Sequence, residues 1–286
     1  MNGRTELAEG VIRLSQSGQK LAVYLINMDG AVDRLAAMRA KLEQVGIGFQ
    51  RIPGVNGKAI EFPIPEFSEW SYRYLHGRRR TPTEVGCYLS HIDCTRAFLD
   101  SDADLALILE DDASFQPEFL DTLDRAAAQR QEWNLLRLTT VSKGRKYPVR
   151  DLGNGHSIAI ALTREKGSGA YVIDRAAARW FVQKLVPMRL AWDIAYDLEY
   201  LAGLKASFIE PPVASKISDE ESQVQRGLSI YKLPRWRYFT VLPYRLWLEL
   251  NRVIWRGGRL LRAKLFDRAA AGTAGRDARE NPPQEG

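Results

Sequence analysis

The stretch Asp104-Leu-Ala-Leu-Ile-Leu-Glu-Asp-Asp112 joins an uninterrupted apolar run to three consecutive carboxylates. The apolar run at 105–109 predicts a strand that is buried on both faces of a sheet. Carboxylates crowded at its end repel one another, and Mg²⁺ or Mn²⁺ relieves that repulsion through the carboxylate oxygens that it prefers. Ligands of open α/β sheets bind at the carboxyl ends of the strands. The stretch therefore predicts a cation site, and a solvated acidic turn before a helix is the alternative.

Strand and helix patterns alternate on both sides of this run. A strand at 21–26, a helical pattern from Asp33 to Gly46 and a strand at 49–52 form a β-α-β unit, which predicts parallel pairing. Polar stretches at 61–83 and 143–155 are expected to be loops. Further helices are expected at 84–99, 117–128, 175–185 and 192–201, and further strands at 135–138, 158–162, 170–173 and 207–209. The pattern predicts an α/β fold with a mostly parallel sheet flanked by helices.

The composition is that of a soluble globular protein, with 286 residues, 45% of them hydrophobic and 27% charged. No apolar stretch approaches the roughly 18 residues of a transmembrane helix, and residues 1–20 lack the apolar core of a signal peptide. Cys87 and Cys94 fit neither a zinc pair nor a disulfide framework. We therefore expect reduced thiols and a cytoplasmic protein.

The positive charge of the chain is concentrated near its C-terminus. The net charge is +6, but residues 226–268 carry eleven Lys or Arg against two acids, a formal +9. Because this segment also contains Trp236, Trp247 and Trp255, it has the composition of a helix at a membrane interface. Anionic lipid would attract such a helix by about 1 kcal/mol for each basic residue near the surface. The alternative is a helix packed on the domain with its Arg side chains in solvent.

These patterns divide the chain into four parts. Residues 1–20 are an irregular lead-in, residues 21–225 are the α/β domain, and residues 226–268 are a basic, aromatic helical extension. Residues 269–286 are rich in Ala, Gly, Pro and charge, and we expect a disordered tail there.

Three blocks occur in a fixed order: Val23–Asn27 with Asp33-Arg34, continued by Ile52–Lys58; then Glu84–His91; then Leu107–Asp112. In this order and at this separation they resemble the family 25 glycosyltransferases. A weaker match at 169–173, followed by Asp193, extends the resemblance over roughly residues 21–225. The resemblance implies a GT-A-like fold, a nucleotide-sugar donor, a divalent metal and inversion at the anomeric carbon.

The resemblance also suggests roles for individual residues. It implies that Asp112 binds the metal, together with Glu110, and that Glu110 and Asp111 can also contact the donor ribose. We expect Asn27 and Arg34 to contact the nucleotide, although Arg34 fits an exposed ion pair equally well. The helix that follows is expected to contribute further donor-binding residues, and these are Glu84, Ser90 and His91. A buried histidine that holds this helix to the carboxylate strand is the alternative for His91.

A catalytic base is needed to deprotonate the acceptor hydroxyl. Asp193 is the first candidate, because it lies at the start of a helix that follows the sheet strands. A helix-capping role is the alternative for Asp193. Asp197, four residues later on the same helical face, is the second candidate base.

The leading hypothesis is an inverting glycosyltransferase that requires Mn²⁺ or Mg²⁺. It would transfer a hexose, galactose in the first instance, from a UDP-sugar to a lipid-linked lipopolysaccharide or other cell-surface glycan. Residues 226–268 would contact the anionic membrane, which places the protein peripherally on the inner face of the cytoplasmic membrane. No nucleic acid partner is expected. A metal-dependent phosphohydrolase and a non-catalytic membrane- or nucleic-acid-binding protein remain as alternatives.

Overall fold

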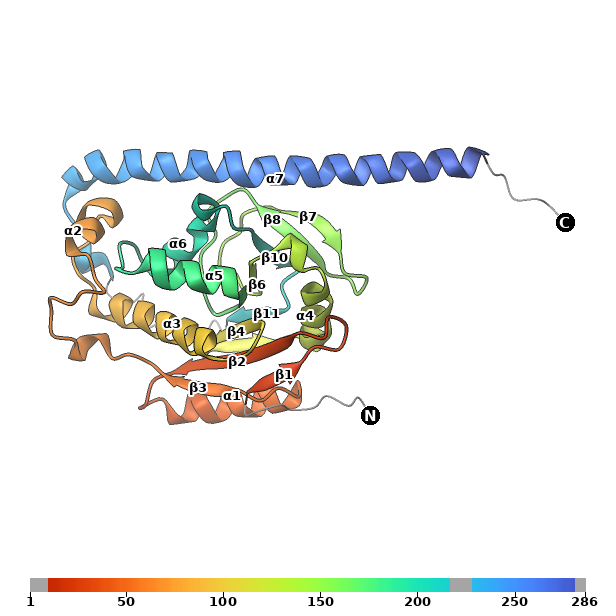
Figure 1. Cartoon of the computed structure of the whole chain (residues 1–286). Coiled ribbons are helices and arrows are strands. Elements are labelled where there is room, and N and C mark those ends of the chain that lie inside the picture. The colour runs from red at the N-terminus through yellow and green to blue at the C-terminus, as the bar shows by residue number, and fades with distance from the viewer. Residues whose placement is uncertain (1–9, 217–227, 281–286) are drawn as a thin grey trace.

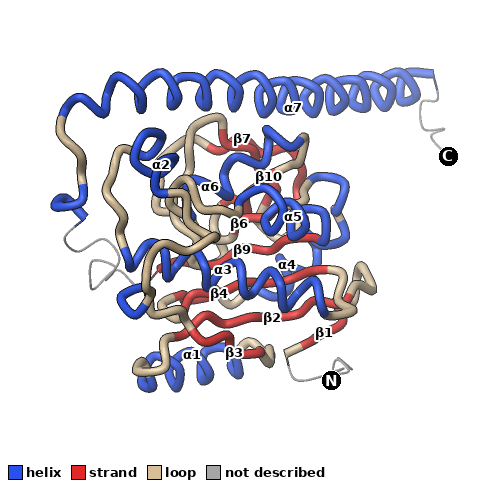
Figure 2. Tube along the Cα trace, turned by 60° about the vertical axis from the view of Figure 1, so that its left-hand side comes forward, coloured by secondary structure: helices blue, strands red, loops and turns tan. Residues whose placement is uncertain are grey.

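The structure, a computed structural model, describes residues 10–216 and 228–280 of the chain. A sheet of nine strands, in the order β1-β2-β4-β9-β6-β10-β8-β7 with β3 paired to β2, forms the centre of this described part. Figures 1 and 2 show helices on both sides of the sheet. The strands are β1 (Val11–Arg13), β2 (Lys20–Asn27), β3 (Gln50–Pro53), β4 (Leu105–Glu110), β6 (Leu135–Arg137), β7 (Lys146–Asp151), β8 (Ser157–Ala161), β9 (Ala170–Asp174) and β10 (Ala206–Glu210).

The sheet is mixed. β2 runs parallel to β3 and β4, and β6 runs parallel to β10, whereas the other pairs are antiparallel. This pattern arises because β9 lies antiparallel between β4 and β6 and so separates two parallel groups. The α/β class with flanking helices and a C-terminal helical extension is confirmed, and the expected mostly parallel sheet is corrected to a mixed one.

Helices cover both faces of the sheet and enclose two apolar cores. Helices α1 and α4 contribute to one core, and α3, α5 and α6 contribute to the other. Leu105, Leu107 and Leu109 of β4 enter the first core, and Ala106 and Ile108 enter the second. Since alternate side chains of a strand point to opposite faces, β4 is buried on both, as its apolar run predicts. The α-helices are α1 (Val32–Gln44), α2 (Glu69–Ser71), α3 (Pro82–Asp100), α4 (Phe119–Ala128), α5 (Arg175–Trp180), α6 (Trp192–Ala195) and α7 (Tyr238–Glu280).

Several segments differ from the sequence prediction. The loop predicted at 143–155 contains β7, an edge strand whose exposed side needs no apolar residues. The lead-in predicted at 1–20 contains β1, although residues 1–9 lie outside the described residues. The tail predicted to be disordered at 269–286 begins inside α7, and residues 281–286 are again outside the described part. A two-stranded sheet that the sequence did not predict joins β5 (Ala113–Phe115) to β11 (Ala214–Lys216).

Helix α7 lies along one side of the domain and extends beyond it, on the side opposite α1 (Figure 1). Val241, Leu248 and Leu260 of this helix are buried against the domain. None of the helices in the described ranges combines the length and apolar character that crossing a bilayer requires.

Two glycines bring α3 against the turn after β3. A Cβ atom on Gly57 would lie 1.7 Å from the carbonyl oxygen of Pro82, and one on Gly86 would lie 2.4 Å from that of Val55. The hydroxyl of Ser90 on α3 also joins these two segments, because it accepts a hydrogen bond from the Val55 amide at 2.8 Å. The backbone approach therefore requires glycine on both sides, and it fixes α3 beside the end of β4.

We predict that Gly86→Ala lowers the free energy of unfolding by about 1–3 kcal/mol, because the added methyl group must displace backbone atoms. Alanine favours a helix over glycine by up to about 1 kcal/mol, so the steric effect has to exceed that gain. Gly258→Ala in α7 is the matched control, since nothing lies within 4 Å of its added Cβ. Urea denaturation of both variants checks the prediction, and a Gly86→Ala protein as stable as Gly258→Ala would contradict it.

Candidate functional site

The three carboxylates Glu110, Asp111 and Asp112, here called the acidic turn, lie at the carboxyl ends of two neighbouring parallel strands. Ile26 of β2 pairs with Glu110 of β4, so Asn27 and the acidic turn lie next to each other. Asn27 donates a hydrogen bond from Nδ2 to Asp111 Oδ2 at 2.7 Å, and Arg34 Nη1 lies 2.9 Å from Asp111 Oδ1. The structure therefore brings together the predicted residues of the first and third sequence blocks. Both Asn27 and Arg34 contact the carboxylate of Asp111.

Three side chains stabilise the negative charge of the Glu110 carboxylate. Ser168 donates a hydrogen bond to Oε1 at 2.5 Å, Lys216 Nζ lies 3.3 Å from Oε2, and His91 Nε2 lies 3.6 Å from Oε1. Burial opposes ionisation of this carboxyl, but His91, Lys216 and Ser168 outweigh it and hold its pKa below the usual value. Glu110 is therefore an ionised carboxylate at neutral pH.

Lys216 is the residue of this site that sequence reasoning missed. It ends β11, whose pairing with β5 places Lys216 opposite Ala113, directly after the acidic turn. Its Nζ lies 2.8 Å from Asp112 Oδ2, and it also contacts Glu110. Burial lowers the pKa of the ammonium, but the two carboxylates raise it further and leave it above its usual value. No motif surrounds Lys216, and strands of three residues carry no periodic signal.

The carboxylates fit a divalent cation in part. Asp112 Oδ1 is buried and has no hydrogen-bond partner among the described residues, and burial and Glu110 raise the pKa of this carboxyl. In the described part of the chain no three His, Cys, Asp or Glu side chains form a ready metal site. Mg²⁺ is commonly held by one or two carboxylates together with phosphate oxygens of a substrate. Glu110 and Asp112 fit that mode, and the Lys216 ammonium lies between them.

The donor-binding residues predicted on α3 are held in the interior. Glu84 accepts hydrogen bonds from Arg78 Nη1 at 2.6 Å and from the Tyr72 hydroxyl, so its carboxylate holds the 61–83 segment to α3. The Ser90 hydroxyl is occupied by backbone groups at both ends. These contacts correct the prediction that Glu84 and Ser90 bind the donor, because neither group has a free face to offer it.

His91 matches the alternative of a buried histidine. Its side chain is 1% exposed, Nδ1 lies 2.9 Å from the Tyr171 hydroxyl, and its ring stacks on Trp192 at 4.9 Å between centroids. His91 Nε2 and Trp192 Nε1 are buried without hydrogen-bond partners among the described residues. His91 therefore orients Glu110 from behind and leaves little surface for direct donor contact.

Asp193 lies in the first turn of α6. It does not cap the helix, because the N-cap is Ala191 and no side-chain cap is formed. Burial raises the pKa of its carboxyl, against the opposing effect of Arg137. The charges of Glu110 and Asp193 both raise the pKa of the Cys87 thiol in α3, after the larger effect of burial. Asp193 is thus a partly buried carboxylate within electrostatic range of the same α3 thiol as Glu110.

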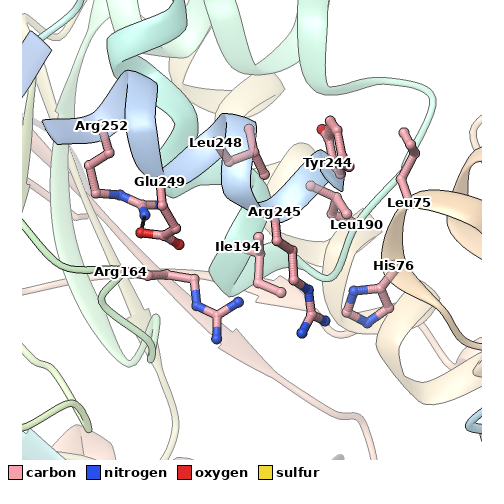
Figure 3. A pocket seen from close by; sticks show the side chains of 10 residues that line it. All are labelled: Leu75, His76, Arg164, Leu190, Ile194, Tyr244, Arg245, Leu248, Glu249 and Arg252. Atoms are coloured by element: carbon pink, nitrogen blue, oxygen red, sulfur yellow. Dashed lines mark hydrogen bonds and ion pairs between the residues drawn. The ribbon is translucent and has the colours of Figure 1, made fainter. Parts of the chain in front are cut away.

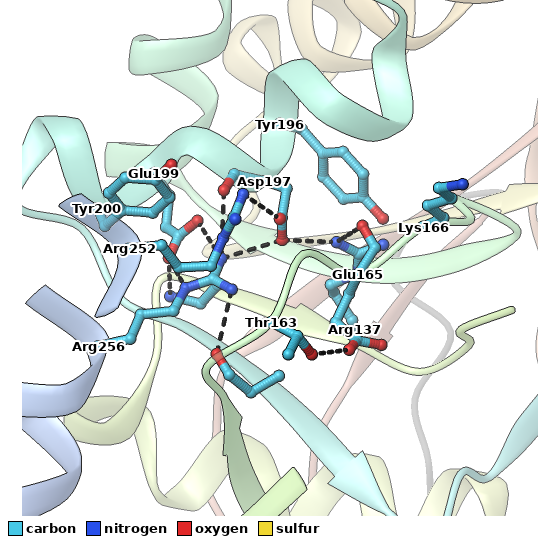
Figure 4. A network of polar contacts seen from close by, with 12 residues as sticks. Arg137, Thr163, Glu165, Lys166, Tyr196, Asp197, Glu199, Tyr200, Arg252 and Arg256 are labelled. Carbon is cyan, nitrogen blue, oxygen red and sulfur yellow. Dashed lines mark hydrogen bonds and ion pairs between the residues drawn. The ribbon is translucent and has the colours of Figure 1, made fainter. Parts of the chain in front are cut away.

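Asp197 is excluded as a base by its surroundings. Its side chain is 0% exposed and contacts Arg137, Arg252 and Arg256 at 3.0, 3.1 and 3.0 Å (Figure 4). Arg256 also pairs with Glu199 at 2.7 Å. The second candidate base is therefore wrong: Asp197 follows Asp193 by four residues, but its carboxylate is paired with Arg137 and with two Arg side chains of α7. Its role is to join α7 to the domain.

We predict that Asp197→Asn lowers the free energy of unfolding by about 3–5 kcal/mol, because it leaves three buried guanidinium groups without their shared counter-charge. Asp193→Asn is the matched variant. The folded-state pKa of the Asp193 carboxyl is raised, so its ionised form opposes folding at neutral pH. Replacing this carboxylate by the amide of Asn should therefore leave the free energy of unfolding unchanged or raise it. Chemical denaturation at pH 7 compares the two, and equal losses would contradict these assignments.

Known proteins resemble this chain over the region that contains the three sequence blocks. The sequence profile described as Glycosyltransferase family 25 (LPS biosynthesis protein) matches residues 20–197. A Glycosyltransferase 25 family member of Drosophila melanogaster is 29% identical over 131 residues, which are 43% of this chain and 21% of that protein. Procollagen galactosyltransferase 1-B of Xenopus laevis is 32% identical over 127 residues, 41% of this chain and 20% of that protein. The chain thus spans about a fifth of the length of these curated relatives.

Among solved structures, a glycosyltransferase involved in the glycosylation of the major capsid of PBCV-1 aligns with 70% of this chain and 94% of its own, at a TM-score of 0.36 and 8% identity. The family profile covers more than half of the chain. The matched residues include β2, the acidic turn, α3 and Asp193. This chain therefore belongs to glycosyltransferase family 25.

Proposed function

We propose that this protein is an inverting, metal-dependent glycosyltransferase that transfers a hexose from a UDP-sugar to a glycan hydroxyl. Membership of family 25 supports glycosyl transfer. The observation that carries the residue assignment is the buried Asp112 Oδ1, which has no hydrogen-bond partner among the described residues. Buried polar groups normally have partners, so this carboxylate oxygen fits a site that a bound cation completes.

Galactose is the proposed sugar, because relatives of this chain are named procollagen galactosyltransferases. The family description names LPS biosynthesis, which supports a lipid-linked cell-surface glycan as the acceptor. Such an acceptor would place the protein at the inner face of the cytoplasmic membrane.

In the proposed reaction, the acceptor hydroxyl oxygen forms a bond to the anomeric carbon as the bond from that carbon to the diphosphate breaks. A carboxylate oxygen of Asp193 takes the hydroxyl proton, for which its raised pKa is suitable. Glu110 and Asp112 would hold Mn²⁺ or Mg²⁺, which supplies positive charge at the diphosphate. Lys216 holds a second positive charge at the same place, and Asn27 and Arg34 fix Asp111 beside it.

We predict that Asp112→Asn lowers UDP release from UDP-galactose with Mn²⁺ and acceptor by at least about 100-fold, or roughly 3 kcal/mol in the barrier. The amide keeps the size of the side chain but removes the charge that would hold the cation. Asp102→Asn, an exposed aspartate before the start of β4, is the matched control. Full activity of Asp112→Asn would contradict the assignment, and release of inorganic phosphate without acceptor would favour a phosphohydrolase.

We predict that kcat/KM falls on the acid side with an apparent pKa above about 3.9, the ordinary value for aspartate. Burial raises the pKa of Asp193, so its basic form is lost at a higher pH than for an exposed aspartate. Asp193→Asn should remove the transfer activity and leave UDP binding intact. An Asp193→Asn enzyme that keeps the wild-type rate and pH profile would disprove the role of base.

The outward face of α7 supports contact with a membrane. The basic residues of this segment were predicted to face lipid, but three Arg side chains on the inner face of α7 contact the domain instead. Arg252 and Arg256 are buried in ion pairs, and Arg259 donates hydrogen bonds to backbone carbonyls of the domain. These Arg side chains therefore add nothing to the attraction of lipid. Between residues 239 and 265 the outer face carries instead exposed apolar side chains, which are Phe239, Leu242, Leu246, Trp247, Leu250, Val253, Ile254, Trp255, Leu261 and Leu265.

Charge complementarity favours an anionic bilayer as the surface that covers this face. Arg262 and Lys264 are exposed beside the apolar side chains. Glu249, the one acid between residues 238 and 265, pairs with Arg252. An amphipathic helix with Trp and Leu on one face and basic residues beside it can lie in the lipid headgroup region.

We predict that the double variant Leu246→Glu with Ile254→Glu loses sedimentation with vesicles of phosphatidylcholine and phosphatidylglycerol, because two carboxylates enter the apolar face. UDP release with a soluble acceptor should stay unchanged. Val32→Glu, a similarly exposed apolar position on α1 at the far side of the molecule, is the matched control. Unaltered vesicle binding of the double variant, or a dimer held by α7 that ignores vesicles, would contradict this surface assignment.

A further inference from the structure

A recess between α7 and the domain is lined by two Arg side chains, Arg164 and Arg245, that have no ion-pair partner among the described residues. Its walls come from the 72–76 turn, the loop after β8, α6 and α7. Figure 3 shows the guanidinium groups of Arg164 and Arg245 and the imidazole of His76 side by side in this recess. This cluster takes no part in the mechanism described above.

Neither Arg164 nor Arg245 forms an ion pair with a described residue. The carboxylate that lines the recess, Glu249, is already paired with Arg252, which in turn also pairs with Asp197. The pKa of Arg245 is lowered by burial and then by the charge of Arg164. Like charges held together in a partly buried place are unfavourable unless an anion joins them.

His76 is a second, independent sign of a missing ligand. It is 4% exposed, and both ring nitrogens are buried without a hydrogen-bond partner in the described part of the chain. Burial, followed by Arg78, Arg245 and Arg164, holds its pKa well below the usual value, so the ring is neutral. A neutral imidazole still offers one N–H donor, and leaving such buried groups unpaired costs about 1–3 kcal/mol.

The recess adjoins the proposed base. Ile194, which follows Asp193 in α6, lines it. Arg164 also acts electrostatically on Asp193. A group bound by Arg164, Arg245 and His76 would therefore lie near Asp193.

We propose that Arg164, Arg245 and His76 form a subsite for an anionic group, phosphoryl or carboxylate, carried by the acceptor glycan. This assignment of acceptor class rests on the proposed glycosyl transfer. Two guanidinium groups suit the oxygens of a phosphoryl or carboxylate group, and the imidazole N–H adds a third donor. The recess is narrow, so binding of the group requires the side chains of Arg164 and Arg245 to move apart. The subsite selects acceptors and positions them, whereas the chemistry stays with Asp193 and the acidic turn.

Direct binding tests the subsite without any need for activity. Inorganic phosphate should raise the melting temperature of the wild-type protein in a buffer without other multivalent anions, since a ligand of the folded state stabilises it. Arg164→Gln and Arg245→Gln should each weaken phosphate binding by at least about 10-fold. Arg262→Gln, an exposed Arg of the same helix, should bind as the wild type does. The subsite would be overturned if phosphate left the melting temperature of the wild-type protein unchanged. It would also be overturned if Arg164→Gln and Arg245→Gln bound phosphate as tightly as the wild type.

A kinetic comparison separates this subsite from the proposed function. Acceptor glycans with and without a phosphoryl group should differ in KM for the wild type, and Arg164→Gln should raise only the KM of the phosphorylated one. UDP release to water in the absence of acceptor should be the same in the wild type and the variant. Equal KM values for both acceptors would overturn the subsite while leaving glycosyl transfer intact. A wild type that binds phosphate but releases no UDP from any UDP-sugar would instead refute glycosyl transfer, and with it the acceptor assignment.

Discussion

Three consecutive carboxylates lie at the end of β4, of which Glu110 is the last residue of the strand, and the surrounding structure compensates their mutual repulsion. Each carboxylate faces different partners: Ser168 and Lys216 contact Glu110, Asn27 and Arg34 contact Asp111, and Lys216 contacts Asp112. These partners come from segments far apart in sequence, so the fold must be complete before the turn is stabilised. What remains uncompensated is Asp112 Oδ1, which has no partner among the described residues and where a bound cation would add the missing positive charge.

The second constraint is the buried ion cluster that joins α7 to the domain. Asp197 and Glu199 are buried and form ion pairs with Arg252 and Arg256. Burial of such charges is tolerated only when each one is paired. The cluster fixes which side of α7 faces the domain and therefore which side faces outward. It also places Arg245 against Arg164 and His76, so the same helix completes the recess beside Asp193. Docking of α7 thus connects the proposed membrane surface to the proposed acceptor site.

Sequence reasoning succeeded where a residue's role depends on its own strand or helix. The apolar run before Glu110 predicted a doubly buried strand, and Asn27, chosen because it ends the preceding parallel strand, does lie beside Asp111. It failed where partners come from distant segments. Nothing around Lys216 indicates that β11 pairs with β5. Likewise, nothing around Asp197 indicates that Arg252 and Arg256 of α7 pair with its carboxylate. The sequence of α7 does not indicate which of its Arg residues are buried.

The account depends on the acidic turn acting as a cation site that a nucleotide completes. The most direct measurement is the electron paramagnetic resonance signal of free Mn²⁺, titrated with protein in the presence and absence of UDP. We expect the wild-type protein to remove one equivalent of Mn²⁺ from solution when UDP is bound, and Asp112→Asn to remove far less under the same conditions. Mn²⁺ binding that UDP does not strengthen, or that Asp112→Asn retains in full, would contradict the central claim.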